Sequence, residues 1–134
     1  MSQPPDLEAR ARVAQGRAYA PYSKFKVGAA VQMKGGHVFD GVNVENASYP
    51  LSVCAERNAI AAAVNGGALE VEAVAVCTDA SPPSSPCGGC RQVLREFTKD
   101  PTKVIVTSVN GKGERRSWTL DELLPDSFSG AELP

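Results

Sequence analysis

Apolar residues along this chain fall into short blocks of two kinds, and these blocks predict its secondary structure. Apolar blocks bounded by turn residues predict strands at 27–33, 38–44, 71–78, 104–109 and about 114–118. Blocks with helical spacing predict helices from the N-cap Asp6 to about residue 19, then at about 53–64, 88–97 and 120–124. A polar loop at 45–52 and a proline- and serine-rich loop at 81–86 join them.

The order of these blocks predicts the fold class. Gly35-Gly36 favours a hairpin between the first two strands, and Pro21 is expected to end the first helix. That helix is expected to face the core with Leu7, Val13 and Ala14. The almost wholly apolar strand at 71–78 is typical of a strand buried on both faces. We predict one α/β domain over residues 1–134, a three-layer α/β/α sandwich with a five-stranded mixed sheet.

Composition and charge narrow the class of function. The chain has 134 residues and a net charge of -1, with no run of five like charges. Proteins that bind nucleic acid usually carry a basic face, so nucleic acid is not an expected partner. The longest apolar stretch, 59–64, is too short to span a bilayer, and the N-terminus lacks the apolar core of a signal peptide. We expect a cytoplasmic protein without a membrane partner, whose cysteines are metal ligands or core residues.

Three of the four cysteines lie at the predicted starts of two helices. Cys87 and Cys90 are three residues apart and share one helical face, and Cys54 begins the other helix. Helix N-termini stabilise thiolates, and three thiolates predict a zinc ion with an open fourth position for water. Glu56 follows Cys54 by two residues, where a carboxylate accepts a hydrogen bond from that water and relays protons.

A structural zinc site and a redox dithiol are the alternatives for the pair Cys87 and Cys90. A structural site needs a fourth ligand, and the remaining cysteine, Cys77, lies in the apolar run 74–78 as a small buried thiol would. A redox dithiol would leave Cys54 without a role. The catalytic interpretation is therefore favoured.

Four segments resemble motifs of the small zinc-dependent cytidine deaminases of the homotetrameric type. They are PYSKFKVGAA at 21–30, NVENASY at 43–49, VCAER at 53–57 and SPCGGCRQVL at 85–94. The tail, Leu123-Leu124-Pro125 followed by Phe128, also fits the family, so the resemblance covers nearly the whole chain. Asn58 departs from it, since a threonine is expected there.

The resemblance implies a role for each candidate residue. It implies one zinc ion per subunit bound by Cys54, Cys87 and Cys90, with Glu56 as the catalytic residue. It implies a substrate site in which Phe25 lies against the pyrimidine and the Ala55 N–H points toward the base carbonyl. Asn43 and Glu45 would hold the ribose hydroxyls, with Val44 between them in the same substrate-binding segment. Arg57 would hydrogen-bond the thiolates and withdraw negative charge from the metal. Tyr49 and Phe128 would act in the site of a neighbouring subunit of a homotetramer.

The implied function is hydrolytic deamination of free cytidine and deoxycytidine to uridine and deoxyuridine with release of ammonia, in pyrimidine salvage. A zinc-bound hydroxide would attack C4 while Glu56 carries the proton to N3 and to the departing amino group. A carboxylate at Glu45 accepts from a sugar hydroxyl but repels phosphate, which favours a nucleoside substrate. The alternatives are a zinc deaminase of another aminated base or nucleoside, such as an antibiotic or an RNA base, and a structural zinc-binding interaction module.

Overall fold

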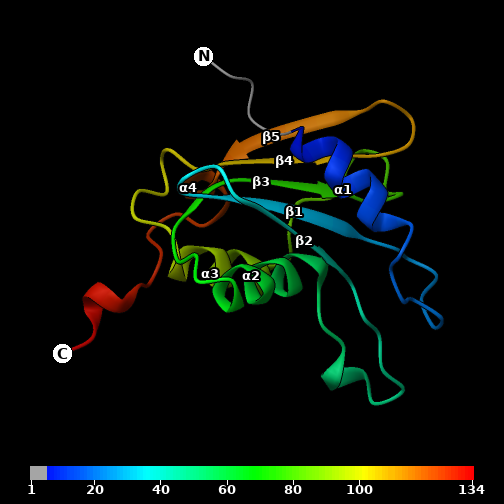
Figure 1. Ribbon diagram of the computed structural model, residues 1–134, viewed down its shortest axis with the longest axis horizontal. Helices are drawn as coiled ribbons and strands as arrows, with labels where there is room; N and C mark the ends of the chain where they lie inside the picture. Colours follow the sequence, from blue (N-terminus) through cyan, green and yellow to red (C-terminus); the bar gives the residue numbers. More distant parts are fainter. Residues whose placement is uncertain (1–5) are drawn as a thin grey trace.

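A five-stranded sheet lies at the centre of the molecule, which is described over residues 6–134 by a computed structural model (Figure 1). Its strands are β1 Gly28–Met33, β2 Val38–Val42, β3 Val71–Cys77, β4 Ile105–Val109 and β5 Arg115–Thr119. They lie in the order β2-β1-β3-β4-β5, with β3 and β4 parallel and the other neighbours antiparallel. The predicted mixed five-stranded sheet is confirmed.

Helices cover both faces of this sheet. They are α1 Leu7–Gln15, α2 Ala55–Asn65, α3 Gly88–Glu96 and α4 Leu120–Leu123, with short 3₁₀ turns at Tyr49–Leu51 and Gly130–Glu132. Figure 1 shows α2 and α3 side by side on one face and α1 on the other. The fold is therefore the predicted three-layer α/β/α sandwich.

Alternate residues of the strands divide the core into two layers. Ala29 and Val31 pack toward α2 and α3, whereas Ala30 packs with Ala11 of α1, as the strand period of two requires. Gly28 allows α1 to approach the sheet closely, because a Cβ there would lie 2.2 Å from the Ala11 carbonyl oxygen. The small residues of β1 thus fix how near the helices lie to the strands.

The first helix is shorter than the sequence predicted. It ends at Gln15 rather than near residue 19, because the chain then pairs with the segment that follows β2. The Tyr19 N–H donates to the Asn43 carbonyl (3.0 Å), and the Tyr19 carbonyl accepts from the Glu45 N–H (2.9 Å). These bonds need an extended backbone, so the helix stops well before Pro21.

The core-facing side of α1 also differs in part from the prediction. Ala14 is buried and Leu7 packs partly against the core, as predicted. The prediction for Val13 was wrong, since its side chain is 65% exposed. Ala11 and Ala14, three residues apart, form the buried stripe, and Val13 lies outside it.

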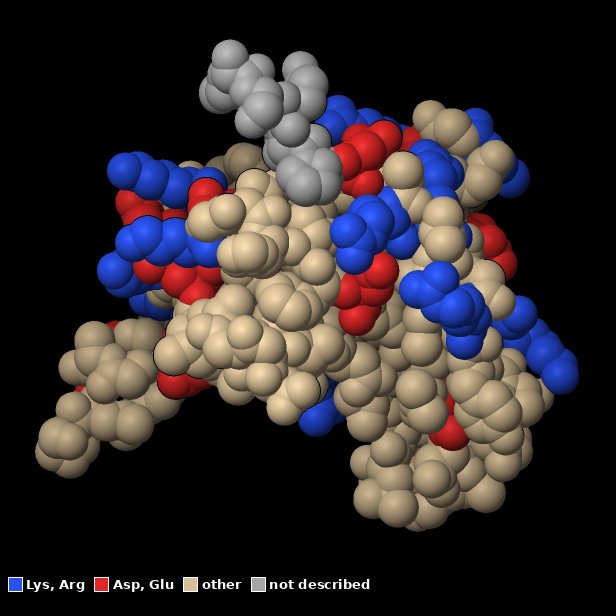
Figure 2. Space-filling view, viewed as in Figure 1, with Lys and Arg blue, Asp and Glu red and all other residues tan. Residues whose placement is uncertain are grey.

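The other boundaries agree with the prediction to within about two residues, which is the usual uncertainty of element ends. β2 ends at Val42 rather than residue 44, and α2 begins at Ala55 rather than residue 53. Within residues 6–134, no helix is long and apolar enough to cross a membrane. On the face in Figure 2, basic and acidic side chains are interspersed.

Candidate active site

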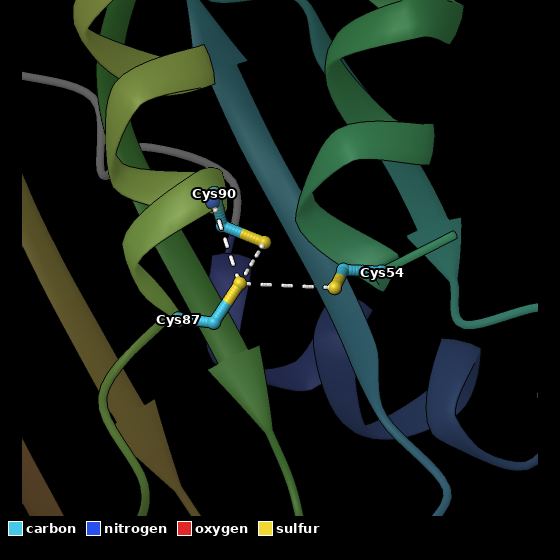
Figure 3. Close-up of side chains that lie close together, drawn as sticks. All are labelled: Cys54, Cys87 and Cys90. Atoms are coloured by element: carbon cyan, nitrogen blue, oxygen red, sulfur yellow. Dashed lines mark hydrogen bonds between the residues drawn. The ribbon is translucent and has the colours of Figure 1, made fainter. Parts of the chain in front are cut away.

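The folded chain brings three cysteines together at the N-termini of two helices (Figure 3). Cys54 is the N-cap of α2, Cys87 is the N-cap of α3, and Cys90 lies in the first turn of α3. The Cys54 and Cys87 sulfurs are 3.9 Å apart, the Cys87 and Cys90 sulfurs are 3.2 Å apart, and all three lie within 4.8 Å of one another. We call these three residues the cysteine cluster.

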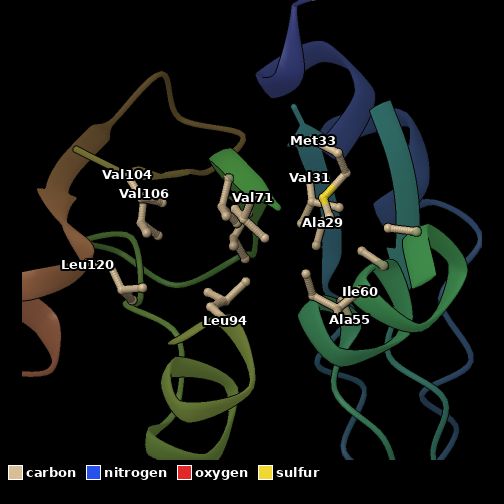
Figure 4. Close-up of a cluster of buried hydrophobic side chains, with 14 of the residues drawn as sticks. Ala29, Val31, Met33, Ala55, Ile60, Val71, Leu94, Val104, Val106 and Leu120 are labelled. Atoms are coloured by element: carbon tan, nitrogen blue, oxygen red, sulfur yellow. The ribbon is translucent and has the colours of Figure 1, made fainter. Parts of the chain in front are cut away.

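Core packing seats the two helices so that their starts meet. Ala55 and Ile60 of α2 pack in the same buried cluster as Leu94 of α3, against the β1 and β3 side chains (Figure 4). Gly41 of β2 lets α2 approach, because a Cβ there would lie 2.3 Å from the Ala55 carbonyl oxygen. The Cys87 sulfur accepts from the Cys90 N–H (3.4 Å), so it also caps its helix.

The cysteine cluster fits a zinc ion. Tetrahedral zinc with Zn–S distances of about 2.3 Å places its sulfurs about 3.8 Å apart, close to the spacing in the cluster. Thiolates are soft ligands that favour zinc over magnesium or calcium. Over residues 6–134, no fourth His, Cys, Asp or Glu ligand atom lies within the same distance of all three sulfurs. The donor set therefore leaves a coordination position for water or substrate, as in catalytic zinc sites.

Glu56 lies in the first turn of α2 beside the cluster, and only 5% of it is exposed. Burial raises the pKa of Glu56 to about 7, and the negative charge of Cys54 adds to the rise. Hydrogen bonds from the thiols of Cys90 and Cys87, helped by the charge of Arg57, lower the pKa of Cys54 to about 6 despite its burial. The hydrogen bond with Cys54 and burial raise the pKa of Cys90. The site thus holds a carboxyl group able to take up and release a proton near neutral pH.

A cavity of about 240 Å³ opens beside these groups. Its walls are formed by the cysteine cluster together with Phe25, Val27, Asn43, Ala55, Glu56, Val76, Thr78, Ser84 and Ser85. These residues come from the segment before β1, the end of β2, the start of α2, the end of β3 and the loop before α3. A larger depression of about 560 Å³, between α1 and β5, contains none of the cysteines.

Of the predicted substrate-binding residues, Phe25, Asn43 and Ala55 line this cavity and Val44 does not. The Asn43 amide is engaged with the backbone: its oxygen accepts from the Val27 N–H (2.9 Å) and its nitrogen donates to the Phe25 carbonyl (2.8 Å). Val44 pairs through its backbone with Val53, and its side chain is exposed. Asn43 therefore holds the segment that carries Phe25.

Glu45 and Tyr49 line a neighbouring hollow with Tyr22, Ser23 and Ser52, which we call the Tyr22–Tyr49 depression. The Glu45 carboxylate accepts from the Ser23 hydroxyl and from the N–H groups of Tyr22 (3.0 Å) and Ser23 (3.1 Å). The hydroxyl contact is the main reason that the pKa of Glu45 is lowered. The Tyr49 ring lies edge-on to Tyr22, 5.9 Å between centroids, and Tyr49 is 70% exposed.

Two further predicted residues lie outside the cavity. Arg57 is exposed and lines a groove of α2 and α3 with Val93 and Phe97, although its charge still lowers the Cys54 pKa. Phe128 is 56% exposed, and its carbonyl accepts from the Gln92 side-chain amide (3.0 Å).

The structure adds a residue to which the sequence assigned no role, Arg91 of α3. Its guanidinium donates to the Pro86 carbonyl (2.7 Å), the Ser85 hydroxyl (2.8 Å) and the Leu123 carbonyl (2.7 Å). It thus fixes the loop that leads into Cys87. The sequence carries no signal for these bonds beyond an arginine next to Cys90, because Leu123 is 32 residues away along the chain.

Convergent thiols with a free coordination position, beside a buried glutamate and a cavity, define a zinc-dependent enzyme. The family described as "Cytidine and deoxycytidylate deaminase zinc-binding region" matches residues 1–108, and the chain belongs to this family. It is 42% identical over 127 residues to a cytidine deaminase of Sporosarcina psychrophila, covering 95% of this chain and 92% of the relative. It is 46% identical over 116 residues to that of Halalkalibacterium halodurans, covering 87% and 86%.

A solved structure agrees with these sequence relatives. The crystal structure of cytidine deaminase from Burkholderia pseudomallei superimposes with a TM-score of 0.85 at 46% identity, covering 91% of this chain and 96% of that chain. The family assignment therefore rests on sequence and on fold together.

Proposed function

We propose that this protein hydrolyses free cytidine and deoxycytidine to uridine and deoxyuridine, releasing ammonia. The observation that carries the proposal is the buried Glu56 beside the cysteine cluster at one wall of the 240 Å³ cavity. Cytidine deaminases of similar length and sequence support the choice of substrate.

Cys54, Cys87 and Cys90 would hold the zinc ion. When bound, zinc lowers the pKa of a water molecule and so supplies a nucleophile near neutral pH. Glu56 takes a proton from the attacking water and delivers it to N3 of the pyrimidine. The same carboxylate then takes the second proton from the oxygen newly added at C4 and delivers it to the amino group. As the C4–N bond breaks and the C4 carbonyl forms, water and cytidine yield uridine and ammonia. One carboxyl group can serve first as base and then as acid, because burial raises its pKa above that of a solvent-exposed glutamate.

The remaining walls position the nucleoside. Phe25 packs against the pyrimidine face, and the Ala55 N–H, at the first position of α2 and so without a helical acceptor, donates to the base carbonyl. Asn43 and Val44 belong to the segment next to the ribose, and Glu45 accepts from a sugar hydroxyl. The negative charge of Glu45 disfavours a phosphate there, and the net charge of -1 likewise favours a nucleoside over a polynucleotide.

The active form is a homotetramer in this proposal. Exposed apolar groups near the site, among them Tyr49, Leu51 and Phe128, support burial against further copies of the chain. Tyr49 and Phe128 would then complete the site of a partner, and Arg57 would turn toward the thiolates. All four thiols are free, which suits the reducing cytoplasm and a role in pyrimidine salvage.

The test follows cytidine absorbance and ammonia release with zinc-loaded protein. The wild type is expected to consume cytidine, and Glu56→Gln to lose about 10²–10⁴-fold in kcat while keeping its zinc. Glu72→Gln, at an exposed position of β3, serves as the matched control and should keep full activity. If zinc-loaded wild type leaves cytidine unchanged, the proposal is wrong; turnover of single-stranded oligonucleotides instead would favour an RNA-base deaminase.

A further inference from the structure

The side chain of Gln15, the last residue of α1, joins three segments behind the cavity. Its amide nitrogen donates to the Lys26 carbonyl (3.1 Å) and to the Asp79 carboxylate (3.0 Å). Its amide oxygen accepts from the Cys77 thiol (3.2 Å). Burial raises the pKa of Cys77, which keeps this thiol protonated as a donor. One side chain therefore ties α1 to the chain before β1 and to the end of β3.

Both tied segments form walls of the cavity. Lys26 lies between Phe25 and Val27, which both face the cavity. Cys77 and Asp79 flank Thr78, which is buried and also lines it. Gln15 itself does not line the cavity. Any effect of Gln15 on substrate binding must therefore act through the wall residues that its hydrogen bonds position.

The position of Gln15 is tightly fixed. A Cβ on Gly28 would lie 2.3 Å from the Gln15 backbone nitrogen, so the end of α1 rests directly on the start of β1. The Asn43 side-chain amide also donates to the Phe25 carbonyl and accepts from the Val27 N–H of the same segment. The segment 25–27 is thus held by two side-chain amides, one from α1 and one from the end of β2.

We propose that Gln15 is a positioning residue that fixes the Phe25 wall relative to Thr78 and thereby sets the affinity for the nucleoside. This inference rests on the proposed function, because it assigns the cavity to that substrate. It predicts an effect on binding rather than on chemistry, since none of the Gln15 bonds involves the cysteine cluster or Glu56.

Three variants separate positioning from simple helix anchoring. Gln15→Leu removes all three bonds, Gln15→Lys keeps a donor for Lys26 and Asp79, and Cys77→Ala removes only the bond to β3. The measurements are kcat and KM for cytidine, Kd for the product uridine, zinc content and Tm.

For Gln15→Leu we expect KM and the uridine Kd to rise about five- to tenfold, with kcat within about twofold and zinc unchanged. Gln15→Lys should recover most of the affinity. Cys77→Ala should lower Tm but raise KM less than Gln15→Leu does, because the bonds to Lys26 and Asp79 remain.

The proposal is overturned if Gln15→Leu lowers Tm as Cys77→Ala does but leaves KM and the uridine Kd at wild-type values. Hydrogen exchange provides a readout that does not depend on turnover. Exchange in a peptide spanning 24–28 should accelerate in Gln15→Leu and not in Cys77→Ala, and equal exchange in the two variants would contradict the proposal. A wild type that fails to convert cytidine would refute the proposed function alone, because the exchange result stands independently of it.

Discussion

The cysteine cluster and the Tyr22–Tyr49 depression belong to hollows that are lined by neighbouring residues of the same segments, but they differ in how complete they are. At the cluster, the sulfurs lie within 4.8 Å of one another and Glu56 is only 5% exposed. At the depression, Tyr49 is 70% exposed, and the Glu45 carboxylate is bonded to Ser23 and Tyr22 of its own chain.

The difference shows which part of the site a single chain can form by itself. The cluster is built from the starts of two helices seated on one sheet face, so a single chain assembles it. The depression is formed by loops around the short turn Tyr49–Leu51, whose aromatic and apolar side chains stay in solvent. The metal-binding half is therefore self-sufficient, whereas the depression, which the proposed function assigns to the ribose, is expected to need a partner subunit.

The largest effect is expected from breaking the cluster itself. Cys87→Ala removes a metal ligand and the cap of α3, so zinc should be lost and turnover should fall at least about 10³-fold. Zinc content and kcat measure this. Cys77→Ala, a change of the one cysteine outside the cluster, should keep its zinc. Full zinc occupancy in Cys87→Ala would show that the cluster does not hold the metal.

A smaller loss is expected when the support of the cluster is removed. Arg91→Met deletes the bonds to Pro86, Ser85 and Leu123, so zinc affinity should fall about 10–100-fold and the free energy of unfolding by about 2–4 kcal/mol. Competition with a chelator and urea unfolding measure the two quantities. Arg95→Met is the matched control. Arg95 lies on the same helix as Arg91, but its side chain bonds Ser127 and Thr98 and does not contact the loop before Cys87. Equal zinc affinity in the two variants would contradict the role of Arg91.

A substitution of Tyr49 tests whether the Tyr22–Tyr49 depression needs a partner subunit. Tyr49→Ala should raise KM for cytidine about tenfold with little change in kcat, because in the proposed tetramer this residue would contact the substrate of a neighbouring copy. Co-refolding Tyr49→Ala with Glu56→Gln should create sites with an intact Glu56 from one chain and an intact Tyr49 from the other. A low-KM component should then reappear in the mixture. If the mixture shows only the KM of Tyr49→Ala, Tyr49 acts within its own chain or not at all.

The smallest effect is expected at Glu45. Glu45→Gln keeps an acceptor but removes the negative charge, so KM for cytidine should rise only about threefold. Discrimination against cytidine 5′-monophosphate should weaken at the same time, since the repulsion of phosphate is lost. Steady-state kinetics with both compounds measure this. Unchanged discrimination would mean that the Glu45 charge does not select the nucleoside.

Local patterns in the sequence were sufficient for the fold class and for placing each metal-binding residue at the start of a helix, whereas only packing brings Cys54 to Cys87. The apolar blocks predicted the five strands and four helices, and the spacing of Cys87 and Cys90 predicted one shared helical face. The helix predicted from about residue 53 placed Cys54 and Glu56 at its beginning, and the structure makes Cys54 the N-cap. Such features depend on the period of a helix or strand, which is a property of neighbouring residues.

Tertiary structure alone decided the features that join distant segments. It ended α1 at Gln15, because pairing of Tyr19 with the segment after β2 outweighed local helix propensity. It turned the Ala11 and Ala14 stripe of α1 toward the sheet and left Val13 in solvent. It also engaged the Asn43 amide with the backbone of the Phe25 segment and directed Arg91 to Leu123. Each of these contacts exists only after helices and loops have packed on the sheet, since the partners are far apart along the chain and no local period relates them.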